Sequence, residues 1–160
     1  MNSGGPEHEI FQEPGIVAEN PTGLGRGTIL VVEDEDFVRE VTCEVLLAAG
    51  YLVLRARTAG EALRLYARSG GKLQLLLTDV VLPGRSGQIL AQELRAISPG
   101  LRTIFISGYP EHQLSKQDLH EPGTSYLPKP FSVQMLLGAV EVVLDGCEIT
   151  CTAEQAVKRA

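Results

Sequence analysis

The sequence predicts an α/β protein with a doubly wound parallel sheet of five strands and five helices. Three observations lead to this prediction. Short, continuous apolar runs alternate along the chain with segments whose apolar residues recur at helical spacing. Parallel neighbours in a sheet need crossover helices, so this alternation favours a sheet that is covered on both faces. The composition agrees, because aromatic residues make up only 5% of the chain, tryptophan is absent, and Leu, Val, Ile and Ala must build the core.

The first two strand–helix units lie between residues 28 and 71. The run 28–33 predicts a buried strand, and Gly50 ends the helix that follows it. A second strand is predicted at 51–56, and Thr58 with Glu61 forms a capping box at the start of the next helix. Helical spacing predicts the buried stripes of these two helices: Phe37, Val38, Val41, Val45, Leu46 and Ala49 in the first, and Ala59, Ala62, Leu63 and Tyr66 in the second.

Three further strands follow, at 73–78, 102–107 and 125–127. Helices are predicted at 86–98 and 132–144. The segment 109–123 is polar and contains two prolines, so any helix there is short, and we expect it to be the most mobile element. Helical spacing again predicts the buried stripes: Leu90, Leu94 and Ile97 in the earlier helix, and Val133, Leu136, Leu137, Val140 and Leu144 in the later one.

These elements form one domain, which we expect at residues 28–145. The chain has 160 residues, 44% of them hydrophobic, which is enough for a single core. Residues 1–27 are rich in Gly, Pro and Glu and predict a flexible leader or linker, and residues 146–160 predict a C-terminal tail.

Charge and cysteine content narrow the functional classes. A net charge of −6 argues against nucleic acid as a direct partner. The N-terminus lacks the pattern of a signal peptide, and no segment has the length of apolar chain that spans a membrane. Three cysteines without framework spacing are typical of reduced thiols, so we expect a soluble, cytoplasmic protein.

Polar residues gather where the predicted strands end. Glu33 and Asp34 follow the first strand, Asp79 follows the third, Ser107 ends the fourth and Lys129 follows the fifth. In a sheet of order 2-1-3-4-5 the first and third strands are neighbours, so their carboxylates meet at the carboxyl edge. Such carboxylates repel one another unless a cation intervenes, and an all-oxygen site suits Mg²⁺. A carboxylate held beside Mg²⁺ and an ammonium can attack a phosphoryl group.

Four motifs in register resemble one known family. The stretches "ILVVEDED", "LLLTDVVLPGRSG", "IFISGYP" and "YLPKPF" are similar in order and spacing to the receiver domain of two-component response regulators. The resemblance covers about residues 28 to 145 and implies a flavodoxin-like fold. The residues within these motifs resemble in particular those of the receiver domains attached to hybrid sensor histidine kinases.

The resemblance implies a role for each residue at the acidic edge. Asp79 would be the phosphoacceptor, taking its phosphoryl group from phosphohistidine on a sensor histidine kinase or a histidine phosphotransfer protein. Asp34 would ligate Mg²⁺ directly together with Asp79, Glu33 would act through a coordinated water, and the backbone carbonyl of Val81 would complete the protein ligands. Lys129 would be the catalytic ammonium.

The resemblance also implies a switch. Ser107 matches the switch hydroxyl and Tyr126 the switch aromatic, while Lys129 would precede a cis peptide bond to Pro130. The outcome is a phosphorylation-dependent surface for a protein partner and is compatible with a weak homodimer. Such a domain is a phosphoacceptor that dephosphorylates itself, not a turnover enzyme.

Three departures from the family pattern and two alternatives remain. Glu33 stands where aspartate is more usual, Ser107 where threonine is commoner, and Arg85 at a position that is often apolar; none of them removes a required group. The apolar side chain of Val81 cannot orient water, so we expect slow to moderate self-dephosphorylation. One alternative is a receiver-like binding module that signals without phosphorylation, which the intact acidic and lysine residues disfavour. The other is a phosphoaspartate hydrolase, which needs a second acid two residues after the nucleophile, where Val81 stands.

Overall fold

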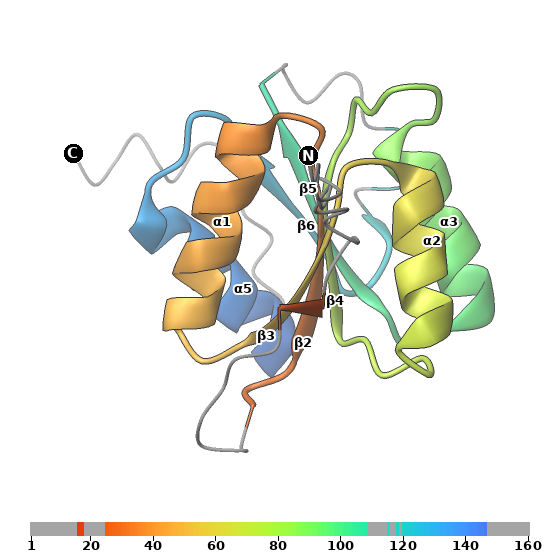
Figure 1. Ribbon diagram of the computed structural model, residues 1–160, viewed down its shortest axis with the longest axis horizontal. Coiled ribbons are helices and arrows are strands. Elements are labelled where there is room, and N and C mark those ends of the chain that lie inside the picture. The colour runs from red at the N-terminus through yellow and green to blue at the C-terminus, as the bar shows by residue number, and fades with distance from the viewer. Residues whose placement is uncertain (1–15, 18–24, 109–114, 116–117, 119, 147–160) are drawn as a thin grey trace, which may run out of the picture.

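The computed structural model describes residues 16–17, 25–108, 115, 118 and 120–146. A central sheet lies between two layers of helices (Figure 1). Its parallel strands run in the order β3-β2-β4-β5-β6, which is the predicted order 2-1-3-4-5. The bounds of these strands are β2 Thr28–Val32, β3 Leu52–Ala56, β4 Leu75–Asp79, β5 Arg102–Ser107 and β6 Thr124–Pro128.

A short strand that the sequence did not predict extends this sheet. β1, Ile16–Val17, pairs antiparallel with β3, placing Ile16 opposite Leu54 and Val17 opposite Val53. It belongs to the segment for which a flexible leader was predicted. The backbone of β1 therefore covers part of the β3 edge, which parallel pairing with β2 leaves open.

The helices of the described residues cover both faces of the sheet. α1 (Asp36–Ala48) and α5 (Val133–Asp145) lie on one face, and α2 (Ala59–Arg68) and α3 (Gly87–Ile97) lie on the other (Figure 1). The fifth predicted helix, within 109–123, falls mostly outside the described residues, as does the predicted tail beyond 146. No helix in the described part of the chain combines the length and the apolar character that crossing a membrane requires.

Each central strand supplies side chains to two hydrophobic clusters. Ile29 and Val31 of β2 pack on the side of α1 and α5, whereas Leu30 and Val32 pack on the side of α2 and α3. Every residue of β4 is buried. This two-sided burial explains why these strands appear in the sequence as continuous apolar runs without alternation.

Hydroxyl side chains cap the amino ends of α2, α3 and α5. Thr58 Oγ1 accepts from the Glu61 N–H at 3.2 Å, and the Arg57 N–H donates to Glu61 Oε2 at 2.8 Å. Ser86 and Ser132 cap α3 and α5 in the same way. The Thr58 cap predicted at the start of α2 is therefore confirmed, whereas Glu61 accepts from the N–H of Arg57, one residue before the N-cap, and not from that of Thr58.

Four of the apolar residues that were predicted to face the core are exposed instead: Phe37, Val41, Ile97 and Val133. In α1 the side chain of Phe37 is 76% exposed, and the buried face consists of Arg39, Thr42, Cys43 and Leu46. These residues also fall at i, i+3, i+4 and i+7. Leu46, Val45 and Ala49 pack on the core as predicted. The buried face is nevertheless rotated away from Phe37 and Val41, because packing on the sheet selects the side of the helix that also carries Thr42 and Cys43.

Cys43 is a free, buried thiol in this rotated face. Burial raises the pKa of the Cys43 thiol to about 11. The thiol is therefore protonated at neutral pH, and it packs as a small apolar group.

Candidate functional site

An acidic cluster lies at the carboxyl edge of the sheet. Glu33 and Asp34 directly follow β2, and Asp79 ends β4, the neighbour of β2. Within the described part of the chain, carboxylate oxygens of these three residues lie within 4.8 Å of one another. Glu33 and Asp79 are buried, whereas Asp34 is exposed. The structure therefore brings together the three carboxylates that the sequence placed at this edge.

Lys129 links two of these carboxylates. Its Nζ lies 2.7 Å from Glu33 Oε2 and 2.8 Å from Asp79 Oδ2. Burial lowers the pKa of the Lys129 ammonium, but the hydrogen bonds to Asp79 and Glu33 outweigh this effect, and the net result is a raised pKa. The ammonium therefore keeps its charge at any pH near neutral.

The backbone around Lys129 directs its side chain into the cluster. The Lys129–Pro130 peptide bond is cis, as the resemblance implied. The Lys129 N–H donates to the carbonyl oxygen of Ser107 at 2.8 Å, which fixes the chain just beyond β6 against the end of β5.

Both carboxylate oxygens of Asp79 have donors. Oδ2 receives the Lys129 ammonium, and Oδ1 accepts from the Val81 N–H at 2.8 Å. The Val81 side chain points away from the core and is half exposed. Asp79 is thus held in one orientation by two different charge-assisted hydrogen bonds.

Glu33 is also fixed at both carboxylate oxygens. Oε1 accepts from the Glu35 N–H at 3.1 Å, and Oε2 accepts from Lys129. Burial raises the pKa of the Glu33 carboxyl above its ordinary value of 4.5, and the charge of Asp79 acts in the same direction. The hydrogen bonds from Lys129 and Glu35 oppose this shift without cancelling it. The charged form of Glu33 is therefore stabilised less in the fold than in water.

Replacing Glu33 by glutamine is expected to change the stability of the metal-free fold in a pH-dependent way, with the variant gaining on wild type as the pH rises. Because the folded pKa is raised, the folded state binds this proton more tightly than the unfolded chain does. The resulting stability is complete below the unfolded pKa of 4.5 and is lost as the pH rises through the raised folded value. A pKa difference of one unit between the folded and unfolded states corresponds to about 1.4 kcal/mol in the free energy of unfolding. Glutamine removes this pH-dependent loss, and its single acceptor oxygen can serve only one of the two donors, Lys129 and the Glu35 N–H, which adds a cost that does not depend on pH.

Urea unfolding in EDTA, from pH about 4 to about 8, measures this effect as the difference in free energy of unfolding between variant and wild type. We expect the difference to move in favour of the variant as the pH rises. A difference that stays constant over this range would contradict the raised pKa of Glu33.

Ser107 and Tyr126 meet at one backbone carbonyl. Ser107 is buried at the end of β5, one residue beyond Ile106, which pairs with Asp79 across the sheet. The Tyr126 hydroxyl donates to the Ser107 carbonyl oxygen at 3.2 Å. The Tyr126 ring is partly buried against the core on the side of α2 and α3. Both predicted switch residues therefore contact the strand end next to Asp79.

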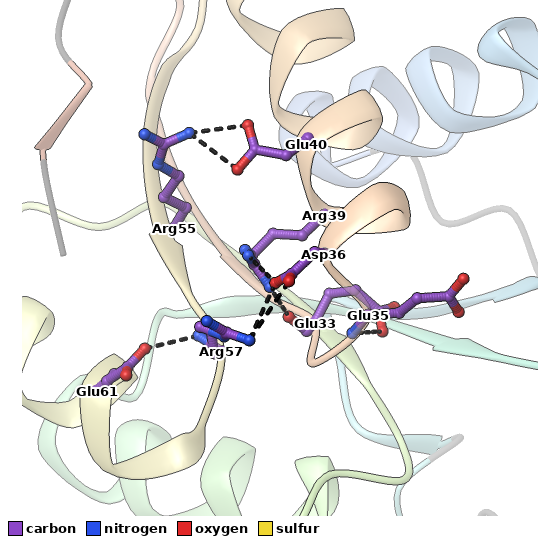
Figure 2. A network of polar contacts seen from close by, with 8 residues as sticks. All are labelled: Glu33, Glu35, Asp36, Arg39, Glu40, Arg55, Arg57 and Glu61. Carbon is purple, nitrogen blue, oxygen red and sulfur yellow. Dashed lines mark hydrogen bonds and ion pairs between the residues drawn. The ribbon is translucent and has the colours of Figure 1, made fainter. Parts of the chain in front are cut away.

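The sequence reasoning missed two residues that shape the site. A Cβ at Gly87 would lie only 2.0 Å from the Asp79 carbonyl oxygen and 2.9 Å from Thr78 Oγ1, so only glycine fits there. Arg39 is buried, and its guanidinium donates to the Glu33 carbonyl oxygen at 2.9 Å (Figure 2). The available signal for Gly87 is its place as the last residue of the motif "LLLTDVVLPGRSG". No periodic signal marked Arg39.

The fold and this site define a class of protein. The family model described as the response regulator receiver domain matches residues 29–141, which is more than half of the chain. The chain belongs to this family, the receiver domains of two-component systems.

Individual relatives agree with this assignment. The chain is 38% identical over 128 residues to the sensor kinase CckA of Brucella abortus, a match that covers 79% of this chain and 14% of that relative. It is 32% identical to the transcriptional regulator NtrC of Azospirillum brasilense, covering 76% of this chain and 25% of the relative. The chain thus spans a quarter or less of the length of either relative.

Solved structures give the same result. The receiver domain of the hybrid histidine kinase CckA superposes with a TM-score of 0.63 at 37% identity, covering 74% of this chain and 99% of that one. A receiver domain from Clostridium thermocellum superposes with a TM-score of 0.68 at 26% identity, covering 74% and 94% of the two chains. The similarity to hybrid-kinase receivers that the motifs predicted is therefore confirmed.

Proposed function

We propose that this domain, acting in the cytoplasm, accepts a phosphoryl group on Asp79 in a Mg²⁺-dependent reaction, from phosphohistidine on a sensor histidine kinase or a histidine phosphotransfer protein. One observation carries the proposal. The carboxylate of Asp79 stands at the carboxyl edge of the sheet, oriented by Lys129 and the Val81 N–H within a cluster of three carboxylates.

The donor set fits a hard divalent cation. Three carboxylates carry three negative charges, and Lys129 supplies one positive charge toward two of them. Oxygen atoms from carboxylates, a backbone carbonyl and water are the ligands that Mg²⁺ prefers. Asp34 and Asp79 would bind the ion directly, Glu33 through a water molecule, and Val81 through its carbonyl. A bound Mg²⁺ would neutralise charge on the oxygens of the transferred group.

The protein residues would each perform one part of the transfer. An oxygen of Asp79 attacks phosphorus while the phosphorus–nitrogen bond of phosphohistidine breaks, and the electron pair of that bond returns to the imidazole nitrogen. The Lys129 ammonium stabilises charge on the phosphoryl oxygens, and the Ser107 hydroxyl donates to one of them. The product is an acyl phosphate on Asp79. We propose that it is lost slowly, because the apolar side chain of Val81 cannot orient an attacking water.

The surface around the cluster supports a protein as the phosphodonor. Phe37, Val81 and Val133 are exposed, and each lies in a segment that follows the carboxyl end of a parallel strand. Exposed apolar side chains in the loops and helix starts at one edge of a sheet are compatible with a surface that meets another protein. The rotation of α1 that exposes Phe37 is therefore consistent with docking at this edge.

Phosphorylation would then act on the switch residues. A phosphoryl group on Asp79 adds negative charge and three acceptor oxygens beside Ser107. Ser107 would move toward that group and Tyr126 would follow it inward, because both contact the end of β5. The changed surface near β6 and α5 would serve a protein partner or a weak homodimer.

The test is the site and the metal dependence of phosphoryl uptake. The protein is incubated with acetyl phosphate, with Mg²⁺ or with EDTA, and its intact mass is followed with time. Borohydride reduction of the acyl phosphate and peptide mapping then locate the modified residue. We expect one phosphoryl group, on Asp79, in the Mg²⁺ arm alone.

Modification at another residue, or equal uptake in EDTA, would contradict the proposal. No uptake from acetyl phosphate or from phosphorylated CckA would instead favour a module that signals without phosphorylation. The same samples report the lifetime of the acyl phosphate after the donor is removed. A half-life of seconds would contradict the proposed slow loss.

A further inference from the structure

Arg39 is a buried cation next to the acidic cluster, on a helix face that otherwise carries small and apolar side chains. The residue is 6% exposed. Its neighbours on the buried face of α1 are Thr42, Cys43 and Leu46. Burying a guanidinium is costly unless its donors are satisfied, and an apolar residue here would avoid that cost. The position therefore calls for an explanation beyond core packing.

The guanidinium binds two acceptors on the loop that carries the cluster. One N–H donates to the Glu33 carbonyl oxygen at 2.9 Å, and another donates to Asp36 Oδ1 at 2.5 Å. Glu33 and Asp36 are the two ends of the segment 33–36. The planar guanidinium of Arg39 thus holds both ends of this segment (Figure 2). Asp34 stands between these two ends in the sequence.

A second arginine, Arg57, also binds Asp36 at the end of this segment. Arg57 Nη2 lies 3.2 Å from Asp36 Oδ1, and the Arg57 N–H donates to Glu61 Oε2 at 2.8 Å (Figure 2). Asp36 is the shared partner of Arg39 and Arg57, so the loop is tied to the start of α2 as well as to α1.

We propose that Arg39 is a positioning residue for the cation site: it fixes the segment 33–36 so that the Glu33 and Asp34 carboxylates face Asp79. The inference rests on the proposed function, because it assigns to Arg39 a part in Mg²⁺ binding at that site. Arg39 contacts a carbonyl of the loop and not the clustered carboxylates, so it acts through their placement. Groups that orient metal ligands commonly change metal affinity by ~10- to 100-fold when they are removed.

The test measures the Mg²⁺ dissociation constant of the unphosphorylated protein by calorimetry, for wild type, Arg39→Gln and Arg39→Lys. We expect Arg39→Gln to bind Mg²⁺ about tenfold more weakly, because glutamine cannot bridge the two acceptors. Arg39→Lys should lie between the two, because a lysine ammonium lacks the planar fork that spans both acceptors.

Arg55→Gln is the matched control. Arg55 forms an ion pair with Glu40 at 3.0 Å near α1, but it does not contact the segment 33–36 (Figure 2). We expect its Mg²⁺ affinity to equal that of wild type. Urea unfolding of every variant measures stability separately from Mg²⁺ affinity. If Arg39 were merely structural, its replacement would lower the free energy of unfolding but leave the Mg²⁺ affinity of the folded protein unchanged.

Equal Mg²⁺ affinity of Arg39→Gln and wild type would overturn the inference. If Arg39→Gln does not fold, Arg39→Lys decides in its place, and wild-type affinity for that variant would overturn it. A wild-type protein that binds no Mg²⁺ overturns the inference together with the proposed metal. A wild-type protein that binds Mg²⁺ but is not phosphorylated on Asp79 contradicts the proposed function alone.

Discussion

Asp79→Asn is expected to abolish phosphoryl uptake from acetyl phosphate. The change keeps the size and shape of the side chain but removes the charged oxygen that attacks phosphorus. The amide also brings an NH₂ group into a position where Asp79 accepts from two donors, the Lys129 ammonium and the Val81 N–H. Loss of a nucleophile costs about 10⁴-fold or more in rate. Intact mass followed over time in the presence of Mg²⁺ measures the rate.

Asp34→Asn is the matched control for this prediction. It removes a carboxylate from the same cluster but leaves the proposed nucleophile in place. We expect slower uptake that higher Mg²⁺ concentrations partly restore, because the loss falls on metal binding. Equal uptake by Asp79→Asn and wild type would mean that Asp79 is not the acceptor.

Gly87→Ala is expected to destabilise the fold by about 3 kcal/mol or more. The new Cβ would lie 2.0 Å from the Asp79 carbonyl oxygen and 3.0 Å from its carbonyl carbon. These atoms belong to the backbone at the end of a buried strand, so they cannot rotate away as a flexible side chain would. Either α3 or the end of β4 must move. The free energy of unfolding in urea measures the effect.

Gly138→Ala is the control, because a Cβ at Gly138 of α5 meets no atom within 4 Å. Alanine has the higher helix propensity, so this variant should be more stable than wild type by about 0.5–1 kcal/mol. Glycine-to-alanine substitution is thus expected to lower the free energy of unfolding at position 87 and to raise it at position 138. A Gly87→Ala variant with the stability of wild type would contradict the close contact between α3 and β4.

The sequence predicted the strands well because their residues are buried on both sides. Continuous apolar runs such as Leu75–Leu77 have few other places in a soluble fold. Helix rotation was predicted less well. In α1 Leu46 belongs to two overlapping faces, one with Phe37 and Val41 and one with Thr42 and Cys43, and periodicity alone cannot choose between them. Contact with the sheet makes the choice.

The site was predicted to the extent that it depends on strand ends. The placement of Glu33, Asp34 and Asp79 together follows from the strand order, and the ion pairs of Lys129 follow from its place after β6. Arg39 could not be found in this way. Its importance comes from a contact between a helix side chain and a backbone carbonyl, and a pattern of residue types does not encode that contact. β1 was missed for a related reason, because two residues are too few to form a pattern.

The carbonyl group of Ser107 could connect the acidic cluster with the outer strand of the sheet. It accepts hydrogen bonds from the backbone N–H of Lys129 and from the hydroxyl of Tyr126, so Lys129 and the aromatic ring share one acceptor. A rotation of this single peptide group would loosen both partners at the same moment. A change at Asp79 could then reach the outer strand β6 without a chain of side-chain contacts, because the peptide group of Ser107 is hydrogen-bonded both to Lys129 and to Tyr126 of β6.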